Sequence, residues 1–199
     1  MSIKRLSGAG LTTPKSNKLW DQTTFQSGMF ALATVSLTSN STSIVFSGIP
    51  SFYTHLQIRG LVRSDRSGNA QDIMKVQYNL DTGTNYASHN LEGNGSIATY
   101  DNYSSTASPW AAMIAGATAT SGVFSAVIID VLDYTTTSKA KVLRSLTGVD
   151  NNDTNGRLYF SSTLWTTSNA AITTVTLAPV YGSNFVSGTT LALYGIKAA

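Results

Sequence analysis

The sequence predicts a single all-β domain, a sandwich or barrel of about ten short strands. Charged residues are only 12% of the 199 residues, about half the usual share. Ser and Thr together make up roughly a quarter of the chain. Thr favours strands, whereas Ser, Asn and Gly favour turns. Short strand patterns follow one another with turn residues between them, and no regular alternation of strand and helix is found, which argues against a parallel α/β sheet.

Apolar and polar side chains alternate along most of the expected strands. In residues 53–62, Leu56 and Ile58 share one face, while Gln57 and Arg59 share the other, as in a half-buried strand. The run within 123–134 is apolar on both faces, which predicts a central strand. The expected strands are 29–37, 43–49, 53–62, 72–80, 123–134, 139–149, 157–165, 171–177 and 189–196.

The alternation recurs in 72–80 and is absent from 84–122. In 72–80, we expect Met74, Val76, Tyr78 and Leu80 to point inward. Residues 84–122 are the least regular part of the chain, and we expect an irregular segment there, with a short helix over 109–115 as the alternative.

Residues 1–24 show the composition of an extended N-terminal arm, ahead of a β-sandwich domain over 25–199. Gly, Thr, Pro, Ser and Asn dominate the segment without a helical or strand period. It is either a frayed terminus or an arm that docks on a neighbouring subunit, and a Trp would be unusual in a fully solvated tail. The candidate partner-binding residues are Lys4, Arg5, Leu6, Leu11, Leu19 and Trp20.

The composition excludes several classes of chemistry. The chain has no Cys, so disulfides and thiolate sites are excluded, and two His residues are too few for a His-based metal site without carboxylates. No apolar run approaches the length of a membrane span, and the N-terminus lacks the apolar region of a signal peptide, which predicts synthesis in a cytoplasm. The net charge of +3 comes largely from the arm, and the rest of the chain is nearly neutral. A nucleic-acid-binding domain usually has a denser basic face, so we expect no nucleic-acid partner.

No catalytic constellation is convincing. Asp130 and Asp133 could form a carboxylate pair, but three residues apart in a strand they point to opposite faces. His55 lies on the polar face of its strand, where a structural function is more common than catalysis. The loop 150–156 holds many oxygen ligands, and it is either a tight turn or a calcium site. We expect a protein without enzymatic activity and without a cofactor.

Aromatic side chains gather in the irregular segment. Such rings either hold a long loop on the sandwich or, beside Asn and Asp, form a surface that recognises carbohydrate or protein. The candidate recognition residues are Tyr86, Tyr100, Tyr103 and Trp110.

Three segments carry a resemblance to a known group of proteins. Residues 46–60 (FSGIPSFYTHLQIRG), 128–134 (IIDVLDY) and 191–197 (LALYGIK) resemble recurrent blocks in structural proteins of tailed bacteriophages, many of them marine. The resemblance spans roughly residues 25–197. It implies an antiparallel, jelly-roll-like β-sandwich on the virion, and it brings no catalytic motif.

The resemblance implies two alternative functions. The first is a capsid decoration or cement protein that grips the major capsid protein through the N-terminal arm. The second is a tail-associated adhesion or receptor-binding protein, part of a tail fibre, that contacts host surface glycan. By analogy with phage surface proteins we expect a homotrimer on the particle surface, made in the host cytoplasm.

Overall fold

The computed structural model describes residues 28–151, 156–166 and 170–197, and this part of the chain is an all-β sandwich without helices. The expected arm over residues 1–24 lies outside the described residues. All strand pairs are antiparallel, as predicted. The strands are β1 (Met29–Ser36), β2 (Ile44–Ser47), β3 (His55–Val62), β4 (Gln71–Tyr78), β5 (Tyr86–Gly93), β6 (Ala98–Thr106), β7 (Trp110–Ala115), β8 (Ser125–Leu132), β9 (Lys141–Val149), β10 (Arg157–Trp165), β11 (Thr174–Pro179) and β12 (Thr190–Ile196).

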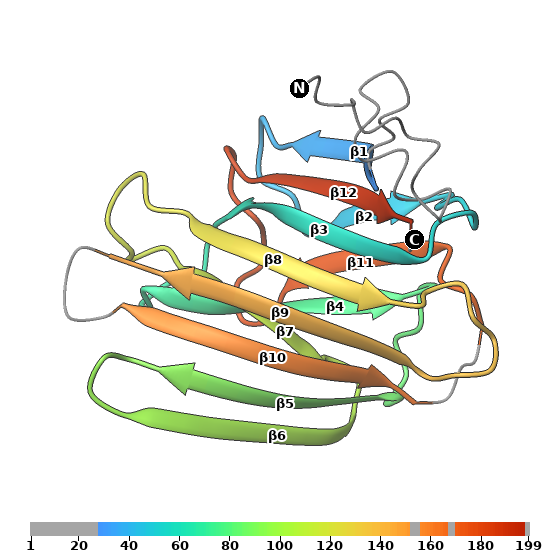
Figure 1. Cartoon of the computed structure of the whole chain (residues 1–199). Helices are drawn as coiled ribbons and strands as arrows, with labels where there is room; N and C mark the ends of the chain where they lie inside the picture. The colour runs from blue at the N-terminus through green and yellow to red at the C-terminus, as the bar shows by residue number, and fades with distance from the viewer. Residues whose placement is uncertain (1–27, 152–155, 167–169, 198–199) are drawn as a thin grey trace, which may run out of the picture.

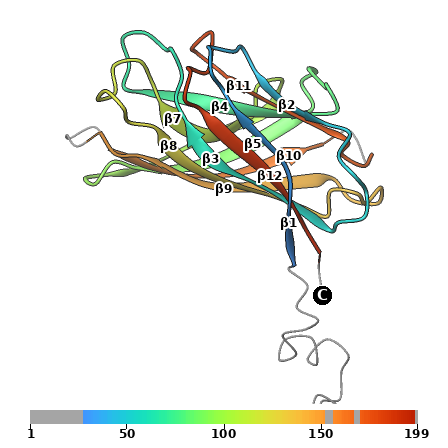
Figure 2. The ribbon, with the colours of Figure 1, turned by 90° about the horizontal axis from the view of Figure 1, so that it is seen from above.

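The strands form two sheets of unequal width. One has eight strands in the order β1-β12-β3-β8-β9-β10-β5-β6, and the other has four in the order β2-β11-β4-β7. In Figure 1 the wide sheet lies in front of the narrow one, and Figure 2 shows the two layers from above. The wide sheet therefore has one face toward the narrow sheet and one face toward the outside.

The core lies between the two sheets and follows the period of two. From the wide sheet, Leu56 and Ile58 of β3 and Ile129 of β8 are fully buried. From the narrow sheet, Val76 and Leu177 close the same core. Because alternate side chains of a strand point to opposite faces, the next residues of β3 and β8 face outward, among them Arg59 and Ile128.

Hydroxyl groups of the wide sheet form hydrogen bonds with the backbone of β7 along the edge that has no neighbouring strand in the described part of the chain. An edge strand has backbone groups without a strand partner, and buried ones must be paired. The hydroxyls of Ser161 and Thr163 donate to the carbonyl oxygen of Trp110, at 2.7 and 3.1 Å. The hydroxyls of Ser145 and Thr147 bond to further backbone groups of β7. Part of the Ser and Thr content thus joins the two sheets rather than covering the surface.

The irregular segment and its helix are wrong predictions. Residues 84–122 contain β5, β6 and β7, which raises the strand number from about ten to twelve. The run 110–115 is a strand paired with β4, and five of its six residues are buried. A short run that is apolar on all sides has no periodicity, so a buried strand and a helix look alike in the sequence.

Leu80 is also placed differently from the prediction. It is exposed rather than inward, because β4 ends at Tyr78 and the chain turns directly after it. Asn79 and Leu80 both take positive φ angles, 50° and 60°, so the alternation of the strand does not extend to them.

Candidate recognition surface

The four aromatic residues predicted to form one surface lie in three different places. Tyr86 is fully buried in the core. Tyr100 is on the outer face of the wide sheet and is 77% exposed. Tyr103 and Trp110 contact each other, with ring centroids 4.6 Å apart. The prediction that all four residues form a single surface is therefore wrong, and only Tyr103 and Trp110 remain as part of a candidate recognition site.

Tyr86 is a core residue because its phase in β5 points it between the sheets. Its ring stacks on Trp165 at 6.3 Å, with an angle of 15° between the planes. The hydroxyl accepts a hydrogen bond from the backbone N–H of Tyr78 at 3.0 Å and donates to the carbonyl oxygen of Asp81 at 3.1 Å. Burial raises the pKa of Tyr86 to about 12. The hydroxyl thus satisfies backbone groups where β4 ends.

Replacing Tyr86 by Phe is expected to lower the free energy of unfolding by about 1–3 kcal/mol, because it leaves the buried N–H of Tyr78 without an acceptor. Chemical denaturation followed by tryptophan fluorescence measures the change. Tyr100→Phe is the matched control, since Tyr100 is 77% exposed in the single folded chain and its loss of a hydroxyl leaves no buried backbone group unpaired. Equal effects of the two substitutions would contradict the assignment.

Tyr103 and Trp110 belong to a larger group, which we call the aromatic cluster: Tyr103, Trp110, Tyr181 and Arg66. Trp110 and Tyr181 meet edge to face, with centroids 6.2 Å apart and planes at 77°. The guanidinium of Arg66 lies 4.2 Å from the centroid of the Tyr181 ring, a cation–π contact. Tyr181 is 53% exposed, so the cluster reaches the surface.

A buried carboxylate holds Tyr181 in this cluster. Asp72, the second residue of β4, is fully buried. It accepts hydrogen bonds from the N–H groups of Tyr181 and Gly182 at 3.2 and 2.9 Å, and from the hydroxyl of Ser64 at 2.7 Å. The loop after β11 is thereby fixed to β4, beside the chain that carries Arg66.

The electrostatics of the cluster are mixed. Desolvation raises the pKa of Tyr103, and the nearby Asp101 carboxylate and the Tyr181 phenol raise it further. A cation, a carboxylate and several ring faces thus lie close together. Rings offer apolar contact and charged groups offer orientation, so the arrangement suits a sugar ring or a protein loop. Arg66 and Tyr181 could not be predicted from the sequence pattern, because each lies in a loop far along the chain from Trp110.

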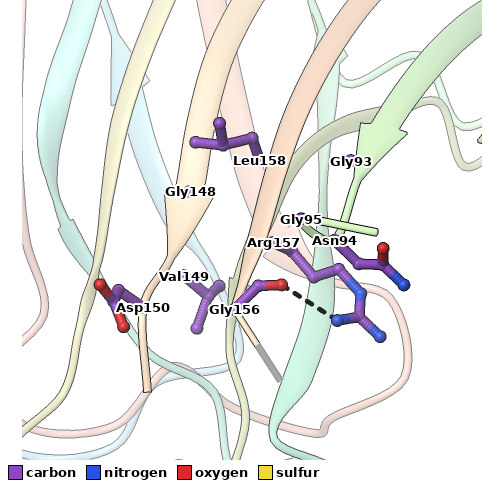
Figure 3. Close-up of a pocket in the computed structure, with 9 residues that line it drawn as sticks. All are labelled: Gly93, Asn94, Gly95, Gly148, Val149, Asp150, Gly156, Arg157 and Leu158. Atoms are coloured by element: carbon purple, nitrogen blue, oxygen red, sulfur yellow. Dashed lines mark hydrogen bonds between the residues drawn. The ribbon is translucent and has the colours of Figure 1, made fainter. Parts of the chain in front are cut away.

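A separate hollow of about 610 Å³ opens at one end of the wide sheet. Figure 3 shows it where the β5–β6 turn meets the end of β9 and the start of β10. Arg157, one of the two charged residues that line it beside Asp150, is engaged by Glu92 at 2.7 Å and by the carbonyl oxygen of Gly156 at 3.0 Å. The lining residues are Gly93, Asn94, Gly95, Gly148, Val149, Asp150, Gly156, Arg157 and Leu158.

Of the three groups considered for catalysis, His55 and Asp133 are neighbours, with 3.6 Å between His55 Nδ1 and Asp133 Oδ1, whereas Asp130 has a different partner. The Asp130 carboxylate accepts from the Gln57 amide at 2.5 Å. His55 Nδ1 accepts from the backbone N–H of Asp133 at 3.0 Å, and the Asp133 carboxylate lies 3.3 Å from Lys139 Nζ.

The calcium alternative for the loop 150–156 stays a prediction, because residues 152–155 lie outside the described part. Elsewhere in 28–151, 156–166 and 170–197, no three His, Cys, Asp or Glu side chains are grouped so that they could hold a metal ion.

The partner-binding residues predicted in the arm, from Lys4 to Trp20, lie outside the described residues. Within the described ranges, no helix is long and apolar enough to cross a membrane. Comparison with known proteins finds no family model and no curated protein that matches the chain.

Proposed function

We propose that this chain is a non-enzymatic structural protein of a bacteriophage particle, attached to the capsid surface as a decoration or cement protein. The main support for the proposal is that the three segments resembling phage structural proteins form adjacent strands of one sheet. Residues 46–60 contain most of β3, residues 128–134 contain the second half of β8, and residues 191–197 contain most of β12. These strands are neighbours in the order β12-β3-β8 in the wide sheet.

Their adjacency supports treating the three segments as one structural signature. They are separated by more than fifty residues each time, yet Ile58 pairs with Ile129 on one side and with Leu193 on the other. All three of these side chains are in the core. A resemblance carried by contacting core positions reflects a shared fold more than a shared surface.

A capsid location is supported by the charge distribution. Four basic residues, Lys4, Arg5, Lys15 and Lys18, precede the first acid, and the remaining chain is nearly neutral. A basic arm is attracted to a capsid shell with an acidic surface. A two-layered sandwich also limits pairing between the strand edges of neighbouring copies, which would otherwise cause aggregation on a crowded particle. The proposed partners are the major capsid protein and further copies of this chain, as a homotrimer.

The aromatic cluster supports the second candidate, a tail-associated protein that binds host surface glycan. Trp110 and Tyr181 offer ring faces, and Arg66 offers hydrogen-bond donors beside them. Such a combination is common where sugars are bound. On this alternative the protein is present in a few copies.

Copy number in purified particles distinguishes the two candidates. For a decoration protein we expect a ratio to the major capsid protein near one, or a simple fraction such as one third, because capsid lattices are symmetric. Quantitative mass spectrometry of whole particles measures it. A ratio of a few per cent would contradict the decoration function and favour the tail, and absence from particles would contradict both.

A further inference from the structure

The outer face of the wide sheet is unusually apolar for a surface exposed to water. Eight of the thirteen large hydrophobic side chains that are exposed in the described residues lie on this one face. We call it the outer apolar face. Its members are Leu61, Leu91, Tyr100, Ile128, Leu132, Leu146, Leu158 and Phe160. A cluster of this kind, rather than scattered single residues, marks an interaction surface.

The strand register joins five of these side chains into one row. Tyr100 of β6 pairs with Leu91 of β5, which pairs with Phe160 of β10. Phe160 pairs with Leu146 of β9, and Leu146 with Ile128 of β8. Neighbouring strands are about 4.8 Å apart, so the row extends about 19 Å across the sheet. In Figure 1 this face of the sheet is turned toward the viewer.

The face is large enough for a stable protein–protein interface. Its members lie on the six neighbouring strands β3-β8-β9-β10-β5-β6, which at about 4.8 Å between strands and about eight residues of about 3.4 Å each cover roughly 800 Å². A typical stable interface buries about 800 Å² on each partner. The apolar row lies at the centre of the five strands β6-β5-β10-β9-β8, as expected for an apolar interface core with a polar rim.

The few charges on this face have both signs. Arg59 of β3 and Arg144 of β9 are exposed, and the Asp130 carboxylate of β8 lies between them in the sheet. A face of a single sign would repel a copy of itself. Here an arginine of one copy can meet the carboxylate of another across a symmetry axis, so the face is complementary to itself.

We propose that a second copy of this chain covers the outer apolar face. Apolar character, area and mixed charge all favour a copy of the same surface over a strongly charged partner. The inference follows from the sheet alone and does not depend on the virion function. The assembly is a dimer if two faces pack on each other, and a trimer if each face meets the β6 edge of the next copy.

The test is the mass of the full-length chain in solution, measured by light scattering and sedimentation at about 10 µM. We expect the wild type at a multiple of the 21.1 kDa chain mass. Leu146→Glu places a charge in the middle of the row and repeats it in every copy, so we expect at least a hundredfold weaker association and a monomer. Leu158→Glu serves if the first variant does not fold.

Val45→Glu is the matched control, because Val45 is an exposed strand residue of β2 in the other sheet. It should keep the wild-type mass, and circular dichroism should show all variants folded. A monomeric wild type at about 100 µM would overturn the proposal. So would an assembly that survives in both face variants, or one that the control disrupts equally. If the wild type were a monomer and deletion of residues 1–27 made it associate, the proposal would be wrong. The chain's own N-terminal segment would then be the occupant of the face.

Discussion

Gly60→Ala is expected to cost about 3 kcal/mol or more of the free energy of unfolding. Gly60 lies in β3 and pairs with Leu191 of β12. A Cβ atom added there would lie 1.9 Å from the carbonyl oxygen of Thr190 and 2.9 Å from the Cα of Leu191. Both are backbone atoms, so no rotamer change removes the clash. Chemical denaturation measures the loss, together with the soluble yield.

Gly93→Ala is the control for this substitution. Gly93 is also a strand glycine of the wide sheet, at the end of β5, but no atom lies within 4 Å of the Cβ position. Adding a methyl group there should change the free energy of unfolding by less than about 1 kcal/mol, with a gain from reduced freedom of the unfolded chain. If both alanine variants were equally stable, the close approach of β3 and β12 at Gly60 would be contradicted.

Asp72→Ala is the second substitution with a large expected effect, a loss of about 3–5 kcal/mol of the free energy of unfolding. The carboxylate accepts from the Ser64 hydroxyl and from the N–H groups of Tyr181 and Gly182. Alanine accepts none of these bonds, and the donors stay in a site where Asp72 itself is fully buried. The loop after β11 should also loosen at Tyr181 and Gly182, although the N–H of Val180 still donates to the carbonyl oxygen of Ile73 in β4.

Two readouts separate this effect from a general loss of packing. Denaturation gives the stability, and limited proteolysis reports whether the loop around Tyr181 opens before global unfolding. Asp72→Asn is the control: it keeps the shape and one acceptor oxygen, so we expect a smaller loss and a loop that stays in place. A loss below about 1 kcal/mol for alanine would contradict the function assigned to this carboxylate.

Most strands could be predicted from the sequence because the pattern that indicates a strand depends only on neighbouring residues. Alternation in β3 places Leu56 and Ile58 inward whatever the partner strands are, since the period of two is a property of a single extended chain. The turn residues between strands act equally locally. The central strand expected over 123–134 is β8, which lies in the middle of the wide sheet between β3 and β9.

The recognition residues were predicted less well because their placement depends on long-range pairing. Tyr86 and Tyr103 are both tyrosines in neighbouring strands, but one contacts Trp165 in the core and the other contacts Trp110 near the surface. Their local sequences do not distinguish these environments. The narrow sheet covers only part of the wide one, and that coverage decides which rings are enclosed.

The sequence by itself therefore determined the all-β class, nine of the twelve strands in the described part of the chain and the inward face of strands such as β3, because these follow from the alternation of neighbouring residues. Only the tertiary structure decided that β3 lies between β12 and β8, that Arg66 and Tyr181 join Trp110, and that apolar residues of five strands align on one outer face. These depend on register and strand order, which are set by contacts between segments far apart in the chain.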